Sequence, residues 1–303
     1  MPTLEQIKEK LRIQKMTPLL KGWSKDLKYI LEDSNSNKYL LRISDISLLE
    51  NKKSQFELLK KLELQDVNCS RPIEFGVLND DKVYIILSYL EGVDAKEVVS
   101  KLSNIEAYNL GVEAGKTLQK LHAISIPIQE KTWWEKYQLK MYRKIDNLNN
   151  CEYKIPMQNE VIEYYKNNAY LMKDRELLFS HGDYHLGNMV YCKGRIGIID
   201  FDKNTIADPY DEFKPYCWNV IESEYFETGL INGYFNNAIP ENFFKILKFY
   251  TAEALISHLP WAVSFGEEEV KMAKFIAEQI MFWYNNFKLD IPIWYKGIVI
   301  PRS

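Results

Sequence analysis

The segment 177–213 carries polar side chains at spacings that suit one kind of chemistry. Asp183 is followed by Asn188 five residues later, and an apolar run then ends at Asp200. Phosphoryl transfer needs a carboxylate that orients the acceptor hydroxyl and takes its proton, and oxygen ligands that hold Mg²⁺ against the phosphates. One aspartate can do the first task, and an asparagine with a second aspartate can do the second.

The same segment resembles the catalytic and metal-binding loops of protein kinases, and it is more similar to those of the aminoglycoside phosphotransferases and choline-kinase-like enzymes. The similarity rests on His-Gly-Asp at 181–183, Ile-Asp-Phe at 199–201 and Asp-Pro-Tyr-Asp at 208–211. It implies an α+β, two-lobed protein-kinase-like fold. It also implies Mg²⁺-dependent transfer of the γ-phosphoryl group of ATP or GTP to a hydroxyl of a small molecule, such as an aminoglycoside-like antibiotic or a related alcohol.

Carried over residue by residue, the resemblance assigns a role to each polar group of the segment. Asp183 is expected to be the catalytic base, and Asn188 and Asp200 are expected to bind the magnesium ion. His181 is expected to brace the loop that carries the base.

Two other classes of function stay open on the sequence. The chain could bind a nucleotide without catalysis, because its phosphate-binding loop is poor in glycine and Arg42 stands where kinases usually carry lysine. The presence of the base together with both metal ligands argues against this. A metal-dependent hydrolase is the other class, since two histidines and nearby carboxylates could bind a transition metal. The residues that would bind it are His181, Asp183, His185 and Asp200 or Asp202.

The groups that contact the phosphates are expected in an N-terminal hairpin. The turn 22–26 is the candidate loop, and Ser24 with neighbouring N–H groups would contact phosphate. Arg42 aligns with the lysine of the kinase strand and is expected to steady the phosphates, although guanidinium is not equivalent to ammonium. Lys38 lies on the same face of that strand by alternation and is the fallback.

The acidic partner of this cation and the base-binding segment are expected further along the chain. The acid should lie on the next helix, where Glu57 fits best and Glu50 is second. Adenine or guanine should bond to backbone groups of Ser88, Tyr89 and Leu90, so the preference for ATP or GTP has no side-chain signature.

The acceptor pocket is expected near Asp183, in the helical part of the chain. Carboxylates and an aromatic wall would suit a cationic aminosugar, but tryptophans at such positions more often pack in a core. The identity of the acceptor therefore stays open. The candidate lining residues are Trp133, Trp134, Tyr184, His185, Asp202, Asp211, Glu212, Trp218, Glu222, Glu224 and Trp261.

The pattern of apolar residues predicts the elements that position these groups. A hairpin near the N-terminus and strands at 72–75 and 83–87 predict a small antiparallel sheet, and a second hairpin is predicted at 188–199. The expected domains are an N-terminal nucleotide-binding lobe at 1–88 and a C-terminal catalytic and acceptor-binding lobe at 89–303. Helices are predicted at 3–14, 51–64, 95–102, 104–122, 134–148 and 156–171.

The composition excludes several classes of protein. The net charge of −3 over 303 residues gives no basic footprint for a nucleic-acid partner. Four dispersed cysteines without a CxxC argue against a zinc ribbon or a disulfide framework. The N-terminal residues lack the pattern of a signal peptide, and no apolar run reaches the length of a membrane span, so a cytoplasmic protein without a membrane partner is expected. The expected partners are a nucleoside triphosphate and an alcohol acceptor, and the oligomeric state is not predicted.

Overall fold

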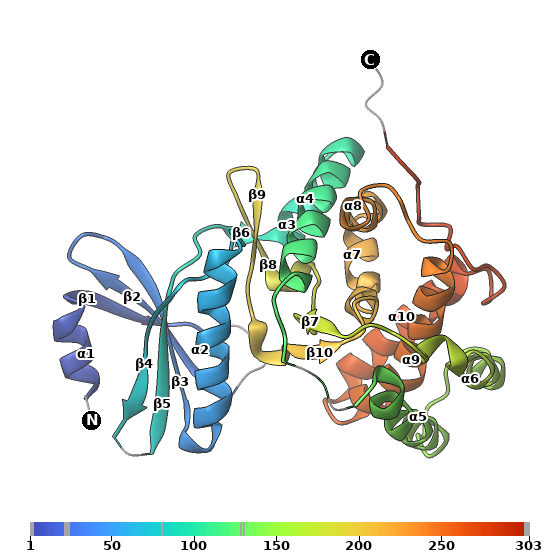
Figure 1. The fold of residues 1–303 in the computed structure, drawn as a ribbon, viewed down its shortest axis with the longest axis horizontal. Coiled ribbons are helices and arrows are strands. Elements are labelled where there is room, and N and C mark those ends of the chain that lie inside the picture. Colours follow the sequence, from blue (N-terminus) through green and yellow to red (C-terminus); the bar gives the residue numbers. More distant parts are fainter. Residues whose placement is uncertain (1–2, 21–24, 80, 128, 130, 300–303) are drawn as a thin grey trace. The chain divides into compact units, whose positions relative to one another are not determined.

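The chain folds into two compact units (Figure 1). The structure, a computed structural model, describes residues 3–20, 25–79, 81–127, 129 and 131–299. The N-terminal unit runs to Val93 and also takes in Val190–Lys193 and Gly197–Asp202, while the C-terminal unit holds the other residues after Val93.

The N-terminal unit is built on a five-stranded antiparallel sheet with the order β1-β2-β3-β5-β4. Leu41 and Ile43 of β3 point to one face, where they form a core with Ile7 of helix α1 (Leu4–Lys10). Arg42 alternates with them and therefore points to the opposite face. The strands are β1 (Ile13–Pro18), β2 (Leu27–Asp33), β3 (Lys38–Asp45), β4 (Pro72–Leu78) and β5 (Lys82–Ser88).

The first helix is shorter than the sequence predicts, so the prediction of a helix over 3–14 is wrong at its C-terminal end. The expected start is confirmed, because Thr3 and Gln6 form a capping box. Arg12 adopts a left-handed conformation with a φ of 54°, which is incompatible with a continuing helix. The chain then enters β1, which begins inside the range that the sequence predicts as helix.

Helix α2 (Leu49–Leu64) confirms the second predicted helix. Its buried side includes Phe56, Leu59 and Leu62, which recur at helical spacing. Lys52 and Gln55 lie on the same buried side. A lysine and a glutamine on the buried side of a helix need polar partners, because burying unpaired polar groups is costly.

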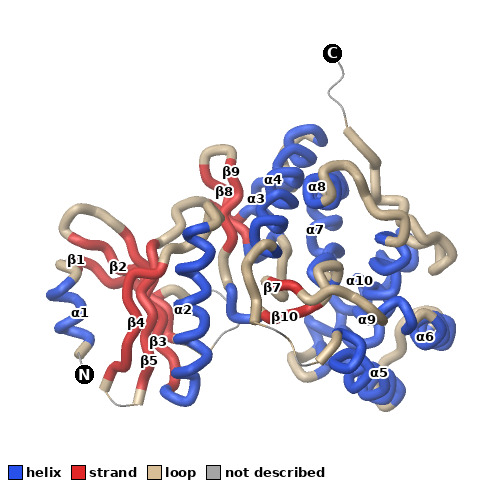
Figure 2. Tube along the Cα trace, viewed as in Figure 1, coloured by secondary structure: helices blue, strands red, loops and turns tan. Residues whose placement is uncertain are grey.

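The C-terminal unit is mainly helical (Figure 2), so the α+β fold with an N-terminal antiparallel sheet is confirmed. The helix predicted over 156–171 ends at Asn167 and is followed by a separate 3₁₀ turn at Ala169–Met172. The helices are α3 (Ala95–Val99), α4 (Asn104–His122), α5 (Trp133–Asn149), α6 (Gln158–Asn167), α7 (Tyr216–Glu222), α8 (Glu224–Tyr234), α9 (Phe243–Val263) and α10 (Glu267–Trp283).

Short strands frame the segment that holds the candidate catalytic residues. β7 (Leu178–Ser180) pairs antiparallel with β10 (Thr205–Ala207), and neither strand was predicted from the sequence. The predicted second hairpin is confirmed as β8 (Met189–Cys192) and β9 (Arg195–Ile198), which join the two-residue strand β6 (Val93–Asp94) in a small sheet.

Helices α4 and α8 pack closely along a stripe of glycines. A Cβ on Gly111 of α4 would lie 2.0 Å from the carbonyl oxygen of Phe226, and one on Gly229 of α8 would lie 2.1 Å from that of Tyr108. A larger side chain at either position would force the two backbones apart, so these glycines set the helix spacing.

Across the described part of the chain, each helix is too short or too polar to span a lipid bilayer.

Candidate active site

The loop that follows β7 is held by a buried carboxylate. Glu212 accepts hydrogen bonds from the backbone N–H groups of His181, at 2.6 Å, and Gly182, at 2.8 Å. Gly182 has a φ of 83°, and a Cβ there would lie 2.2 Å from the carbonyl oxygen of Lys203. Glycine is therefore required at this position, and the loop presents Asp183 from a fixed backbone.

Asp183 sits in a polar cradle within the C-terminal unit. Its Oδ2 accepts a bond from Asn188 Nδ2 at 3.0 Å and one from Lys203 Nζ at 2.9 Å. His185 Nε2 lies 3.6 Å from Asp183 Oδ1. Burial alone would raise the pKa of Asp183, but His185 and Lys203 hold this pKa well below its ordinary value. The carboxylate is therefore ionised at neutral pH and can accept a proton or a hydrogen bond.

His181 lies behind this loop. Its side chain is fully buried, and its ring packs edge-on against the Tyr184 ring, with the centroids 5.8 Å apart. Within the described residues, no group of three or more His, Cys, Asp or Glu side chains is arranged to hold a metal ion. The geometry therefore gives no support to the transition-metal site of the hydrolase alternative.

Arg42 lies at the centre of a buried cluster of charges in the N-terminal unit. Asp26 Oδ2 accepts bonds from Arg42 Nε at 2.9 Å and from Lys52 Nζ at 2.7 Å, and Asp26 Oδ1 accepts one from Ser44 Oγ at 2.7 Å. Asp202 contacts the same guanidinium, and its other oxygen accepts a bond from Gln55 Nε2 at 2.7 Å.

The charges of this cluster reinforce one another. Burial alone would raise the pKa of Asp26 and of Asp202, but Lys52 and Arg42 lower both. Burial alone would lower the pKa of Arg42, but Asp202 and Asp26 raise it. Asp26 and Asp202 are therefore ionised beside the Arg42 guanidinium, and the bonds within the cluster satisfy its buried charges.

The expected pairing of Arg42 with Glu57 is not what the structure contains. Glu57 is exposed and pairs with Lys60 at 2.8 Å, one turn along α2, and Glu50 is exposed as well. The helix supplies a lysine to the cluster, and the acid comes from the start of β2. The spacing of Lys52 with Phe56 and the leucines of α2 could have identified this lysine in the sequence, because that spacing places Lys52 on the buried side of the helix.

Asp200 lies beside this cluster. Its backbone φ is 63°, and its Oδ1 lies 4.0 Å from Arg42 Nη1. The carboxylate remains partly exposed. A left-handed conformation at a non-glycine residue is uncommon, and it turns this side chain out of the direction of β9.

The expected base-binding segment follows β5. The N–H groups of Ser88 and Tyr89 donate to the carbonyl oxygens of Arg71 and Lys38, so neither N–H is available to a nucleotide base. Residues 22–24 of the candidate loop at 22–26, Ser24 among them, lie outside the described residues, while Asp26 at the end of that loop belongs to the Arg42 cluster. A hollow of about 210 Å³ lies on the Arg42 side of the sheet. It is lined by Lys15, Thr17, Ile30, Glu32, Lys38 and Tyr89.

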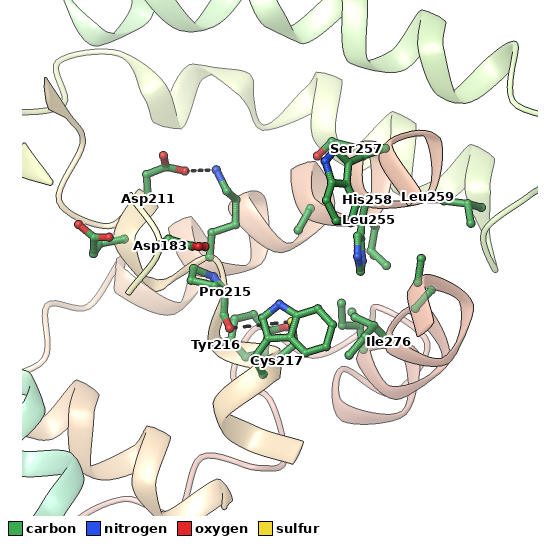
Figure 3. A pocket seen from close by; sticks show the side chains of 18 of the residues that line it. Asp183, Asp211, Pro215, Tyr216, Cys217, Leu255, Ser257, His258, Leu259 and Ile276 are labelled. Carbon is green, nitrogen blue, oxygen red and sulfur yellow. Dashed lines mark hydrogen bonds and ion pairs between the residues drawn. The ribbon is translucent and has the colours of Figure 1, made fainter. Parts of the chain in front are cut away.

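A cavity of about 320 Å³ in the C-terminal unit has Asp183 in its wall (Figure 3). Of the expected acceptor-side residues, Asp211, Glu212, Trp218 and Trp261 also line it. Trp133 does not, because its indole is buried and donates to Tyr250 Oη at 2.9 Å.

The other expected acceptor-side residues make separate contacts. Tyr184 is buried and donates to the carbonyl oxygen of Ala114. Glu222 pairs with Lys96, at 3.2 Å. Among the tryptophans named above, Trp133 lies in the core, and Trp218 and Trp261 lie in the cavity wall. The sequence alone could not decide between these two positions.

Asp208 is structural. It is fully buried and accepts a two-pronged bond from Arg175, at 2.8 and 2.7 Å, together with a bond from Tyr250 Oη at 2.7 Å. These contacts fix the chain between β10 and α7, from which Glu212 reaches the Asp183 loop.

Solved structures with a similar fold include kinases and phosphotransferases. An amicoumacin kinase in complex with AMP-PNP, Ca²⁺ and Ami superposes with a TM-score of 0.66 at 14% identity, over 94% of both chains. The ADP-bound aminoglycoside phosphotransferase APH(2'')-Ib gives 0.63 at 19% identity, over 90% of this chain and 97% of that one. Aminoglycoside phosphotransferase APH(4)-Ia gives 0.65 at 15% identity, over 91% and 96%. These likenesses confirm the kinase-like fold.

Sequence comparison assigns the family. A search of curated proteins found no match. The model of the phosphotransferase enzyme family, APH, matches residues 15–240, which include β2 to β5 and the whole Asp183 loop. Because this match covers most of the chain, the resemblance inferred from the motifs is confirmed, and the chain belongs to the phosphotransferase enzyme family.

Proposed function

We propose that the protein transfers the γ-phosphoryl group of ATP or GTP to a hydroxyl of a small molecule, with Mg²⁺ as cofactor. The observation that carries this proposal is the ionised Asp183 carboxylate, held by Asn188 and Lys203 in the wall of a cavity. Solved structures of the same fold contain AMP-PNP or ADP, which supports a nucleotide donor.

Asp183 acts on the acceptor. Its carboxylate orients the hydroxyl and takes the hydroxyl proton as the new oxygen–phosphorus bond forms and the bond between the γ-phosphorus and the β–γ bridging oxygen breaks. The nucleoside diphosphate leaves with the bridging oxygen. A carboxylate whose pKa is lowered is a weak base, and this suits a loose transition state, in which the proton is transferred late.

The donor is bound by the N-terminal unit. Arg42 and Lys52 are the cations available to the phosphates, and they would exchange part of their contact with Asp26 and Asp202 for phosphate oxygens. The adenine or guanine ring of the nucleotide would occupy the hollow beside Tyr89. It would bond to the backbone of Leu90 or to nearby carbonyl groups. Glu57, which pairs with Lys60 on the exposed side of α2, has no part in this binding.

Asn188 and Asp200 suit magnesium by the chemistry of their donor atoms. The Nδ2 of Asn188 is engaged by Asp183, which leaves Oδ1 as the atom for a metal, and Asp200 offers a partly exposed carboxylate. Both are hard oxygen ligands of the kind that Mg²⁺ prefers. When bound, the metal would neutralise charge on the phosphates.

Nucleotide binding without catalysis is the second candidate. It is favoured by one observation: Arg42 stands where kinases usually carry lysine, and its guanidinium is held by Asp26 and Asp202.

The test compares wild type with Asp183→Asn and with Asp146→Asn, a matched change at an exposed residue of α5. Purified protein, Mg²⁺ and radiolabelled ATP or GTP are incubated with aminoglycosides, macrolides, choline, simple amino alcohols, or water alone. Asp183→Asn should lose at least about 100-fold in turnover and still bind nucleotide, because a general base contributes about that much. Equal turnover in all three proteins would refute the assignment of the base. Nucleotide binding without any turnover would favour the second candidate.

A further inference from the structure

The cavity that contains Asp183 has a chemical character that bears on the acceptor. Asp183 lies in its wall together with Ser180, Gly182 and Thr205. Most of the other lining residues come from the segment 211–218 and from helices α9 and α10 (Figure 3). All of these residues belong to the C-terminal unit. The chemical character of these residues therefore indicates which kind of molecule could bind next to the catalytic carboxylate.

The carboxylates of this wall are already bound to groups of the protein. Asp211 pairs with Lys214 at 2.6 Å, and both oxygens of Glu212 accept backbone N–H bonds. Lys214 also lies 3.6 Å from Glu253. A polycationic acceptor would need free carboxylates for its ammonium groups. In the described wall Asp211 is engaged by Lys214, Glu212 by backbone N–H groups and Asp183 by Lys203.

Two helices make the deep part of the wall apolar. Leu255 and Leu259 come from one face of α9, and they are almost completely buried. Ile276 and Ile280 come from one face of α10, at a spacing of one helical turn. Small residues on the same faces leave the space between the helices, namely Ala254, Ala273 and Ala277.

Aromatic rings line another part of the wall. The His258 ring lies between Trp218, with ring centroids 6.0 Å apart, and Trp261, at 5.7 Å. Burial lowers the pKa of His258, so this imidazole is neutral at physiological pH and is a flat, weakly polar surface. Trp261 is 46% exposed, which leaves part of its ring available to a ligand.

From these walls we infer that the acceptor is an alcohol carried on a flat, apolar ring system with little positive charge. Its ring system would pack against Trp218, Trp261 and the faces of α9 and α10, and its hydroxyl would reach Asp183. This inference rests on the proposed function for the role of Asp183, and it narrows the acceptor class, since a polyamine sugar would gain little from an apolar wall.

The test measures binding first, without nucleotide. Isothermal titration compares 2-(2-naphthyl)ethanol, a neutral aromatic alcohol, with kanamycin A, a polycationic sugar, on wild type, Trp261→Glu and Phe282→Glu. Phe282 is the matched control, because it is 66% exposed on α10 and does not line the cavity. We expect the naphthyl alcohol to bind wild type more tightly than kanamycin does. Trp261→Glu should weaken the naphthyl alcohol roughly tenfold, and Phe282→Glu should leave it unchanged.

Opposite results would overturn the inference. These are tighter binding of kanamycin than of the naphthyl alcohol, an unchanged affinity for the naphthyl alcohol in Trp261→Glu, or no binding of the naphthyl alcohol up to its solubility limit. Phosphate transfer is then measured separately, with Asp183→Asn as control. If the alcohol fails to bind while Asp183-dependent transfer to kanamycin occurs, the acceptor class is wrong and the proposed function stands. If it binds and Asp183-dependent turnover is not found with any acceptor, the proposed function fails and the ligand class stands.

Discussion

Asp26→Asn tests whether the buried charge cluster stabilises the N-terminal unit. The Asp26 side chain is only 6% exposed and accepts bonds from Arg42, Lys52 and Ser44. Asparagine keeps the shape of the side chain and removes its charge. The amide nitrogen of asparagine would also be a hydrogen-bond donor facing Arg42, Lys52 and Ser44, which are donors themselves.

The expected loss can be estimated from the partners that remain. Removing one member of a buried ion pair costs about 3–5 kcal/mol, because the other charge is left uncompensated. Here Asp202, which is 25% exposed, still contacts the guanidinium of Arg42. We therefore expect the lower end, a decrease of about 3 kcal/mol in the free energy of unfolding at pH 7. Urea unfolding followed by circular dichroism, with hydrogen exchange of the β2 and β3 amides, measures it.

The effect should depend on pH with a defined sign. The folded-state pKa of Asp26 lies below its unfolded value, because Lys52 and Arg42 outweigh the effect of burial. The stabilisation is therefore present above the unfolded pKa of about 3.9 and is lost as the pH falls through the lower folded value. The difference between wild type and Asp26→Asn should shrink in that acidic range.

Asp45→Asn is the matched control in the same unit. Asp45 is 60% exposed and lies 3.4 Å from Lys82, so its charge is screened by water and should matter little. Asparagine can still accept the cap bond from Ser47 N–H. An equal effect of Asp26→Asn and Asp45→Asn on unfolding would refute the reasoning about the buried cluster.

Three further changes test other parts of the C-terminal unit. Lys203→Met should lower the turnover number about threefold, because an exposed lysine contributes modestly to holding Asp183, and Lys203→Arg should restore it. Burial raises the pKa of Glu227 to about 8, so wild-type stability should fall as the pH rises from about 4 toward that value, and Glu227→Gln should remove this fall in melting temperature. Gly229→Val should lower the free energy of unfolding by about 2 kcal/mol or more, because its Cβ would lie 2.1 Å from the Tyr108 carbonyl oxygen.

Each of these has a result that contradicts it. Unchanged turnover in Lys203→Met would mean that the lysine does not position Asp183. A pH dependence of stability that persists in Glu227→Gln would assign the fall to another group. A Gly229→Val protein as stable as wild type in urea would show that α4 and α8 can separate at little cost.

The sequence predicted the fold class and the family because both depend on local patterns. Gly182 is required by backbone geometry, and the order of Asp183, Asn188 and Asp200 follows from a short loop and hairpin. The alternation of β3 put Arg42 on the face opposite Leu41. Such features involve residues close together in the chain, so their spacing carries the information.

The charge partners could not be predicted in the same way. Asp26 and Lys52 meet Arg42 from a different strand and from a helix, and Lys203 reaches back across a hairpin to Asp183. Exposed and buried charges look alike in a sequence, so the sequence could not show that Glu57 of α2 is exposed while Lys52 of the same helix is buried.

The character of the cavity at Asp183 was decided by tertiary structure alone. Trp133 and Trp261 are equally plausible lining residues in the sequence, but one is buried in the core and the other is partly open at the cavity. The sequence offers Asp211 and Glu212 as partners for a cationic ligand. In the structure Asp211 pairs with Lys214, and Glu212 accepts a bond from the backbone of the Asp183 loop. Long-range packing determines which polar groups remain free for a ligand, and no periodicity along the chain records it.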